Sequence, residues 1–263
     1  MHNNLFRFPV LAVGLALGSV GHTQFASSDK LVNVDSGAPV SLGKFRFDAG
    51  FAFHRGAEGR TYTSGAFGYG VSEGWEVGFR ASGAPRGDST SGGVTVRTGG
   101  RDFEVFAKHS LKSVEGLTLS LGASFPDTPA QDQNFITAGA SYTVPQGEAK
   151  HRFVVGARGA MRKDSNLWGV SAGVVAPFQA GWEAVADVTA IVQGNNSLTS
   201  DGDRTRRAIF GFGVRYRPVT AEGAPSATFT LGLSNGLGAT TGFGLSSALE
   251  GKIALTLGVS VRN

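Results

Sequence analysis

The stretch Lys252-Ile253-Ala254-Leu255-Thr256-Leu257-Gly258-Val259-Ser260-Val261-Arg262 alternates strictly between apolar side chains and small or polar ones. Successive side chains of a β-strand point to opposite faces, so the apolar residues of this stretch form one continuous face. Segments of similar length and pattern recur about a dozen times between Lys44 and the C-terminus, separated by turns rich in Gly, Asp, Asn and Ser. That repetition predicts a membrane-spanning β-barrel.

The alternating segments can be assigned along the chain as a series of about twelve strands, although small boundary shifts would give ten or fourteen. We expect strands at residues 44–54, 61–71, 75–82, 101–111, 116–125, 134–144, around Phe153–Ala157, 167–176, from Trp182 onward, 210–217, 227–234 and 252–262. The links after even strands are mostly short, whereas several links after odd strands are long and polar. Since such barrels have short periplasmic turns and longer external loops, both termini are expected in the periplasm.

Composition limits the alternatives to this fold class. Hydrophobic residues make up 41% of the chain, and no stretch after the N-terminal region offers the roughly 20 apolar residues of a spanning helix. Glycine accounts for 40 of 263 residues, which suits a crowded lumen or strongly coiled strands. The chain has no cysteine, so neither disulfides nor thiolate metal sites are available, and we expect no metal and no cofactor.

Two other classes of protein fit the pattern less well. A soluble β-sandwich or lipocalin-like barrel also alternates, but the many aromatic residues of these strands would overfill its small core. The net charge of +4 comes from basic residues scattered along the chain, which argues against nucleic-acid binding. The expected fold is therefore all-β, a single antiparallel transmembrane barrel.

The N-terminus has the features of a secretory signal. Arg7 precedes an apolar run, Phe8–Val20, and small residues follow it, so residues 1–21 are expected to be a signal peptide. The alternative is a membrane anchor, but the run is short and is interrupted by proline and glycine. Residues 22–43 are expected to form an extended periplasmic leader, and residues 44–263 the barrel.

Charged side chains share the face opposite to the apolar one. The expected pore-lining set is Arg46, Asp48, Glu76, Arg80, Glu104, Lys108, Arg152, Arg158, Glu183, Asp187, Arg215 and Arg217. In one interpretation these charges pair into a lattice that fills a closed interior. In the other, their basic excess lines a water-filled pore that favours anionic or sugar-like solutes.

Over residues 44–263 the pattern resembles outer-membrane β-barrels of the porin and small-channel type. The run Thr63-Ser64-Gly65-Ala66-Phe67-Gly68-Tyr69-Gly70-Val71-Ser72-Glu73-Gly74-Trp75-Glu76-Val77-Gly78 and the segment Leu233-Ser234-Asn235-Gly236 also resemble barrels linked to exopolysaccharide export. Such barrels usually end in an aromatic residue that the assembly machinery recognises, whereas this chain ends Val261-Arg262-Asn263. The resemblance implies the outer membrane as location, and outer-membrane lipid, small hydrophilic solutes and the barrel-assembly machinery as partners.

One segment suggests an enzyme. Leu233-Ser234-Asn235-Gly236 resembles part of the His-x-Ser-Asn-Gly motif of the outer-membrane phospholipase A family, in which the histidine acts as the base. This sequence has Gly232 in place of that histidine, and a serine hydroxyl without a base is a poor nucleophile. We therefore expect no catalytic residue, and lipid hydrolysis is the least favoured hypothesis.

The favoured function is a passive, porin-like channel for small hydrophilic solutes. Its width and charge would be set by the inward residues and by inward-folding loops such as Gly83–Gly100. The alternative is a closed structural or assembly barrel associated with envelope polysaccharide export.

Overall fold

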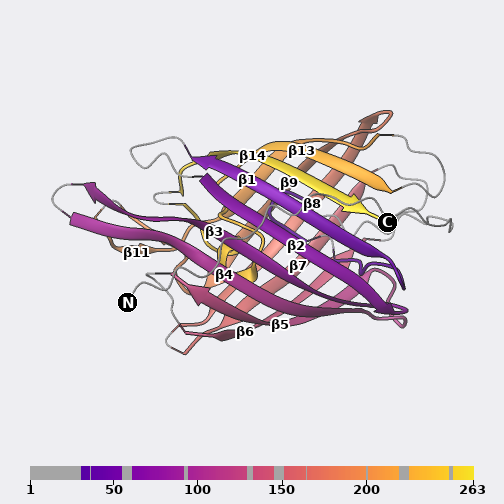
Figure 1. The fold of residues 1–263 in the computed structure, drawn as a ribbon, viewed down its shortest axis with the longest axis horizontal. Coiled ribbons are helices and arrows are strands. Elements are labelled where there is room, and N and C mark those ends of the chain that lie inside the picture. The colour runs from indigo at the N-terminus through magenta and orange to yellow at the C-terminus, as the bar shows by residue number, and fades with distance from the viewer. Residues whose placement is uncertain are drawn as a thin grey trace, which may run out of the picture.

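The computed structural model describes residues 31–35, 37–54, 61–91, 94–128, 133–144, 151–163, 165–199, 201–218, 225–248 and 251–263. Over these ranges, the long strands join edge to edge into one closed antiparallel barrel (Figure 1). Its strands are β1 (Phe45–His54), β2 (Thr61–Ser72), β3 (Trp75–Ser91), β4 (Val94–Ser110), β5 (Leu117–Asp127), β6 (Phe135–Thr143), β7 (Arg152–Met161), β8 (Leu167–Gln179), β9 (Trp182–Gln193), β12 (Ile209–Tyr216), β13 (Ser226–Ser234) and β14 (Ala254–Arg262). The predicted fold class and strand number are confirmed.

The barrel closes where its first and last strands meet. β1 pairs with β14 from Arg46 opposite Arg262 to His54 opposite Ala254, without interruption. Closure is needed because hydrocarbon offers no partner to the N–H and C=O groups of an open strand edge. The backbone N–H of Asn263 also donates to the carbonyl of Phe45 at 3.2 Å, so both chain ends of the wall lie at one end of the barrel. We call it the periplasmic end, and the opposite one the external end.

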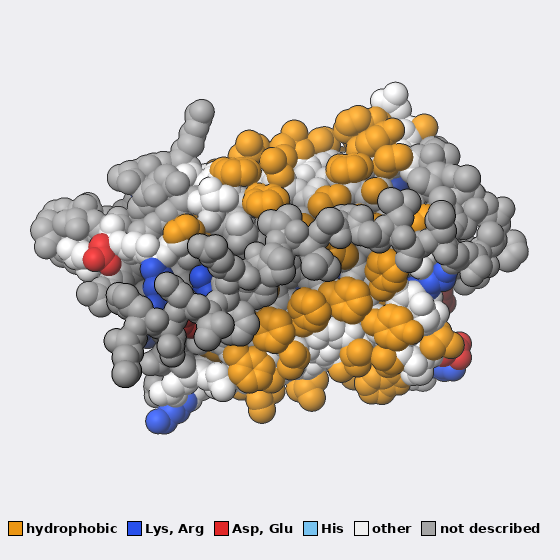
Figure 2. Space-filling model, viewed as in Figure 1, with side chains coloured by type: hydrophobic (Ala, Val, Ile, Leu, Met, Phe, Trp, Pro, Cys, Tyr) orange, Lys and Arg blue, Asp and Glu red, His pale blue; other side chains and the backbone are white. Residues whose placement is uncertain are grey.

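The outer surface carries a belt of apolar side chains. Phe47, Leu119 and Leu257 are 43%, 43% and 42% exposed on the outward face, whereas their sequence neighbours point inward. Figure 2 shows hydrophobic side chains over the middle of the wall and charged ones toward the two ends. Such a belt between polar ends matches the hydrocarbon layer of a membrane, so the protein is an outer-membrane β-barrel.

Aromatic rings reinforce one side of this belt. The rings of Phe45, Phe67, Phe79, Phe103 and Phe125 follow one another across β1 to β5, with centroid separations between 5.6 and 6.5 Å. Neighbouring rings at these distances attract each other beyond the effect of burial alone. The alternation of the sequence thus produces contacts between neighbouring strands as well as a lipid-facing surface.

No helix among the described residues has the length and apolar character needed to cross a membrane.

The connection Gly83–Gly100 does not fold inward as the sequence suggested. β3 and β4 continue to pair as far as Ser91 opposite Val94, with a register shift between Ala84 and Gly87. Figure 1 shows this hairpin reaching past the neighbouring strands. Its polar composition favoured a loop, but β-branched residues recur between Ser89 and Thr98, and these favour a strand.

Within the part of the chain that the structure describes, the connection between β13 and β14 folds inward at the external end. Its described part inside the barrel, residues 235–248, contains the short helix α1 (Thr241–Gly244), which is entirely buried. Another external connection, between β9 and β12, forms a small hairpin from β10 (Ser197–Leu198) and β11 (Arg204–Thr205). We call residues 235–248 the lumen loop.

A second segment enters the barrel from the periplasmic end. Residues 31–35 and 37–43, which we call the strap, precede β1 and contact inward-facing side chains of the wall. At the periplasmic end the N–H of Gly43 donates to the carbonyl of Gly70 at 2.8 Å. This part of the expected leader therefore lies inside the barrel and is not free in the periplasm. The signal peptide, residues 1–21, and the start of the leader lie outside the described residues, and the division into segments stays a prediction.

The outward orientation of β5 generates a test. Leu121 is 61% exposed at the middle of this strand, so Leu121→Arg should lower the free energy of unfolding in lipid vesicles by about 2–4 kcal/mol. Val114 lies in the turn before β5 and is 43% exposed, and Val114→Arg should cost less than about 1 kcal/mol. Denaturant titrations of both variants in vesicles measure the difference. Equal costs would mean that Leu121 does not face hydrocarbon.

Candidate functional site

The predicted inward residues all lie on the lumenal face of the wall or directly beside it. Seven of them are buried: Arg46, Glu76, Arg80, Glu104, Lys108, Asp187 and Arg215. The others, Asp48, Arg152, Arg158, Glu183 and Arg217, are partly exposed. The structure brings most of them into contact with the strap or with the lumen loop. Their role in lining a pore stays a prediction.

Asp187 of β9 holds the tip of the strap. Its Oδ2 accepts the backbone N–H groups of Val32, Asn33 and Val34 at 2.7, 2.6 and 3.2 Å. Its Oδ1 accepts the side-chain amide of Asn33 at 2.9 Å. Four bonds to one buried carboxylate satisfy its charge, which would otherwise be costly in the interior.

Glycines in the wall let the strap approach this closely. A Cβ atom at Gly211 would overlap Val32 and Asn33, and one at Gly173 would overlap the side chain of Leu31. At the periplasmic end, a Cβ at Gly70 would overlap the backbone of Ser41. Part of the glycine content therefore has a specific cause, since the strap backbone lies directly against the wall.

Apolar contacts support the tip of the strap. Leu31 and Val34 pack against Val154, Val175 and Val185, which point inward from β7, β8 and β9 and are no more than 2% exposed. Inward valines would be poorly placed in an empty, water-filled lumen. The strap covers them and so removes this apolar surface from water.

The middle of the strap makes charged contacts. Asp35 Oδ2 accepts hydrogen bonds from Lys108 Nζ at 2.6 Å and from Arg80 Nη2 at 2.9 Å. Burial opposes the charged form of Asp35, but Lys108 and Arg80 outweigh this effect, so the pKa of the carboxyl lies below its ordinary value. Nearer the periplasmic end, the N–H of Val40 donates to Glu76 at 2.9 Å, and Arg46 also binds Glu76, at 3.1 Å.

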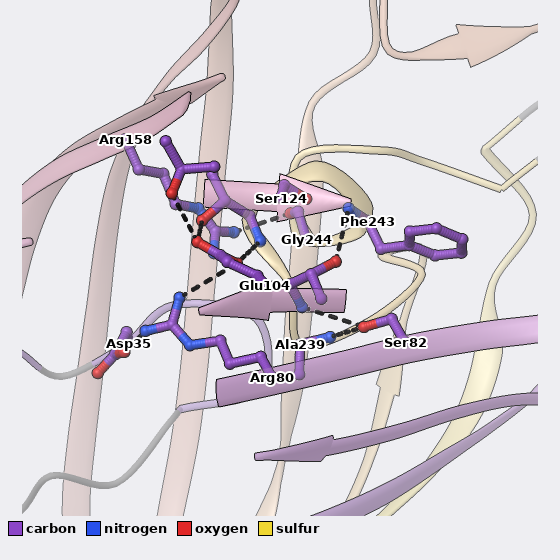
Figure 3. Close-up of polar contacts among 12 residues, drawn as sticks. Asp35, Arg80, Ser82, Glu104, Ser124, Arg158, Ala239, Phe243 and Gly244 are labelled. Carbon is purple, nitrogen blue, oxygen red and sulfur yellow. Dashed lines mark hydrogen bonds and ion pairs between the residues drawn. The ribbon is translucent and has the colours of Figure 1, made fainter. Parts of the chain in front are cut away.

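The lumen loop is held by a parallel set of bonds. Glu104 of β4 accepts the backbone N–H and the hydroxyl of Thr241 at 2.6 and 2.8 Å. Ser82 Oγ accepts the N–H groups of Ala239 and Thr240 at 2.8 and 3.0 Å, and Arg158 donates to the carbonyl of Gly244 at 2.8 Å (Figure 3).

The lumen loop also makes apolar contacts. Phe243 packs in a cluster with Tyr62 and Ala254, and Leu245 packs in another with Leu167 and Ile209. Both clusters lie inside the wall, so the loop is fixed by packing as well as by hydrogen bonds.

The strap and the lumen loop are linked to each other. Figure 3 shows Arg80 between Asp35 of the strap and Glu104, which holds the loop, and Arg80 Nη1 lies 3.7 Å from Glu104 Oε2. At the tip, Ser234 Oγ donates to Asn33 Oδ1 at 2.8 Å and accepts the N–H of Gly236 at 2.9 Å. The serine of the hydrolase-like segment is therefore a structural contact between strap and loop.

The linked strap and lumen loop do not fill the barrel completely, and two cavities remain beside them. One of about 140 Å³ lies between the strap and the wall of β1, β2, β13 and β14, and extends from Arg215 and Ser260 to Tyr62 and Leu237. A second, of about 50 Å³, lies between the strap and β4 to β8, beside Lys108. Arg80 and Arg158 border both cavities.

Arginines gather in the periplasmic half of the lumen. Arg215 Nη1 and Arg217 Nη2 approach the same oxygen of Glu183, at 3.6 and 3.9 Å. Arg46 also pairs with Asp48, at 3.0 Å. Within the described ranges, no group of three or more His, Asp or Glu side chains is placed to hold a metal ion.

The sequence indicated the wall residues of the site but missed the strap residue Asp35 and the loop-binding residue Ser82. A usable signal was present in β7 to β9. The triplets Phe153–Val155, Val174–Ala176 and Ala184–Ala186 are apolar on both faces, which means that something other than water covers their inward members.

No family model matches the chain. A search of curated proteins also finds no match. Among solved structures, the chain is similar to the KdgM porin, with a TM-score of 0.45 and 7% identity over 83% of this chain and 97% of that one. It is also similar to the Acinetobacter baumannii outer membrane protein Omp33 (TM-score 0.40, 10% identity, 84% and 98% covered) and to a bacterial polysaccharide outer membrane secretin (TM-score 0.41, 9% identity, 84% and 98% covered). Likenesses this distant assign neither a family nor a solute.

The bonds to Asp187 generate a test. Asp187→Asn removes the charge and one acceptor oxygen, so the amides of Val32–Val34 should exchange with solvent about tenfold faster or more. Hydrogen exchange followed by mass spectrometry measures this. Glu183→Gln neutralises another inward carboxylate of the same strand and should leave these amides protected. Unchanged exchange in Asp187→Asn would mean that other contacts hold the tip.

Proposed function

We propose that this protein is an outer-membrane channel for small hydrophilic solutes, with a path narrowed by the strap and the lumen loop. The observation that carries this proposal is the cavity of about 140 Å³ along β1, β2, β13 and β14. It runs lengthwise inside the wall and is bordered by hydroxyl side chains, such as those of Ser64, Thr230 and Thr256, and by charged side chains. Solutes would cross by diffusion, stripped only partly of their water.

The charge around this cavity favours anions. Its charged border consists of Arg46, Arg80, Arg158 and Arg215 against Asp35 and Asp48. Charged groups close to a narrow, low-dielectric path raise the local concentration of the opposite ion. The proposed channel therefore prefers anionic or strongly polar solutes to cations.

A second candidate is a closed barrel that anchors or accompanies envelope polysaccharide export. It is supported by the bonds of Asp187, Glu104 and Ser82, which hold two chain segments across the lumen. In this case the strap and the loop are permanent fillings, and the remaining cavities hold only water.

Ion conductance separates the two candidates and also tests the charge preference. Protein inserted into planar bilayers should conduct, with anions more permeant than cations. Arg158→Gln combined with Arg215→Gln should lower the anion-to-cation permeability ratio roughly twofold or more, because both arginines border the path.

Lys112→Gln is the matched control. It removes the same kind of charge from an exposed periplasmic turn, where Lys112 pairs with Glu73, and should leave the permeability ratio unchanged. Stable insertion without conductance would favour the closed barrel. An equal permeability ratio in all variants would mean that Arg158 and Arg215 do not border the path of the ions.

The strap's effect on the path can be tested without changing any charge. Gly211→Ala places a Cβ against Val32 and Asn33, so it should displace the strap tip and raise the single-channel conductance. Gly258→Ala adds the same methyl group beside the larger cavity, where the nearest atoms are 3.7 Å away, and should change little. Equal conductance of the two variants would mean that the strap does not limit flow.

A further inference from the structure

The wall binds the carboxylate of Asp35 as it would bind a small carboxylate ligand. One oxygen of Asp35 accepts from both Lys108 Nζ, at 2.6 Å, and Arg80 Nη2, at 2.9 Å. Its other oxygen accepts the N–H of Gly37, two residues further along the strap, at 3.1 Å. The carboxylate belongs to the strap, and both cations belong to the wall.

The two cations also contact a wall side chain that does not belong to the strap. The guanidinium of Arg80 lies 4.2 Å from the centre of the Phe106 ring, and Lys108 Nζ lies 5.5 Å from it. Phe106 is buried between their strand positions, on the same inward face. Cations above an aromatic face are attracted by its negative charge density, so the ring fixes both groups near one point.

Burial makes these cations dependent on an anion. The side chain of Lys108 is 2% exposed and that of Arg80 is 11% exposed. Two neighbouring positive charges with so little water repel each other strongly, and a carboxylate between them offsets that repulsion. Arg80 also approaches Glu104, but Glu104 is occupied by two hydrogen bonds from Thr241 of the lumen loop.

We propose that Arg80 and Lys108 form a carboxylate-binding site that Asp35 occupies as a tethered ligand, in competition with small carboxylate-bearing solutes. The site borders both lumen cavities through Arg80, and the smaller cavity through Lys108, so a solute in either one reaches it. A solute that replaces Asp35 releases the middle of the strap, while Asp187 still holds its tip. Asp35 thus blocks the binding of free carboxylates at this site until one of them displaces it.

This proposal goes beyond the channel function and does not depend on it, because carboxylate binding can be measured in detergent without any conductance. The chain has no cysteine, so Ala38→Cys in the strap gives a single labelling site. Ala38 is partly exposed and lies between Asp35 and the Val40 contact to Glu76. The rate of maleimide labelling then reports how far the middle of the strap detaches.

The test removes the tethered carboxylate and supplies a free one. In chloride, Asp35→Ala in the Ala38→Cys background should raise the labelling rate about tenfold or more, the size expected for hydrogen bonds between charged groups. The thermal unfolding temperature should fall in chloride and recover in sodium acetate at the same ionic strength, with saturation, because acetate fills the vacated site. Adding Lys108→Gln should abolish the acetate-specific recovery.

Asp48→Ala is the matched control. It removes a lumenal carboxylate that pairs with Arg46 at 3.0 Å and belongs to the wall. It should leave the labelling rate unchanged and show no acetate-specific stabilisation. Identical behaviour of Asp35→Ala in acetate and chloride, or an equal acetate effect in Asp48→Ala, would overturn the proposal.

A second measurement covers the case in which Asp35→Ala fails to assemble. With Asp35 intact, increasing acetate should accelerate labelling of Ala38→Cys relative to chloride at equal ionic strength, because acetate competes with Asp35. A labelling rate that depends only on ionic strength would overturn the proposal. Absence of conductance, by contrast, would contradict the channel function and leave this site standing.

Discussion

Pairing of β1 with β14 closes the wall, and this closure makes the other features of the barrel possible. In hydrocarbon every backbone N–H and C=O must find a partner within the protein, and only an uninterrupted ring of strands provides that. The ring in turn separates side chains into a lipid-facing and an inward-facing set. It also fixes the circumference, and twelve strands enclose more space than their own side chains fill. Chain segments from both ends of the barrel occupy that space.

The strap and the lumen loop are held by the same two kinds of hydrogen bond. Wall carboxylates accept backbone N–H groups, as Asp187 does from the strap and Glu104 from the loop. Wall cations donate hydrogen bonds to oxygen atoms of the inner segments: Lys108 donates to the carboxylate of Asp35, and Arg158 donates to the carbonyl of Gly244. These four charges are thereby hydrogen-bonded, which is the condition for keeping a charge in a low-dielectric interior. Inward valines and leucines supply the apolar part of the same contacts.

This arrangement changes the charge that a solute meets. Asp187, Glu76 and Glu104 hold the strap and the loop and do not line the larger cavity. The charged residues that border this cavity are Arg46, Arg80, Arg158 and Arg215 with two carboxylates, Asp35 and Asp48. In the proposed channel, a solute would therefore meet more basic than acidic groups. Strap and loop are linked through Arg80 and through the hydrogen bond between Asn33 and Ser234.

The wall could be predicted from the order of residues alone. The period of two predicts Phe47, Leu121 and Leu257 outward and the charged residues on the opposite face, because neighbouring side chains of a strand alternate. Turn and loop chemistry was less decisive, since the polar run Gly83–Gly100 continues the β3–β4 hairpin. The segments that fill the barrel could not be predicted in this way. The contacts of Asp35 with Lys108 and of Asn33 with Asp187 join residues far apart in the chain, and no local pattern encodes them. They form because closing the ring brings distant strands around one shared interior, where the strap finds its partners.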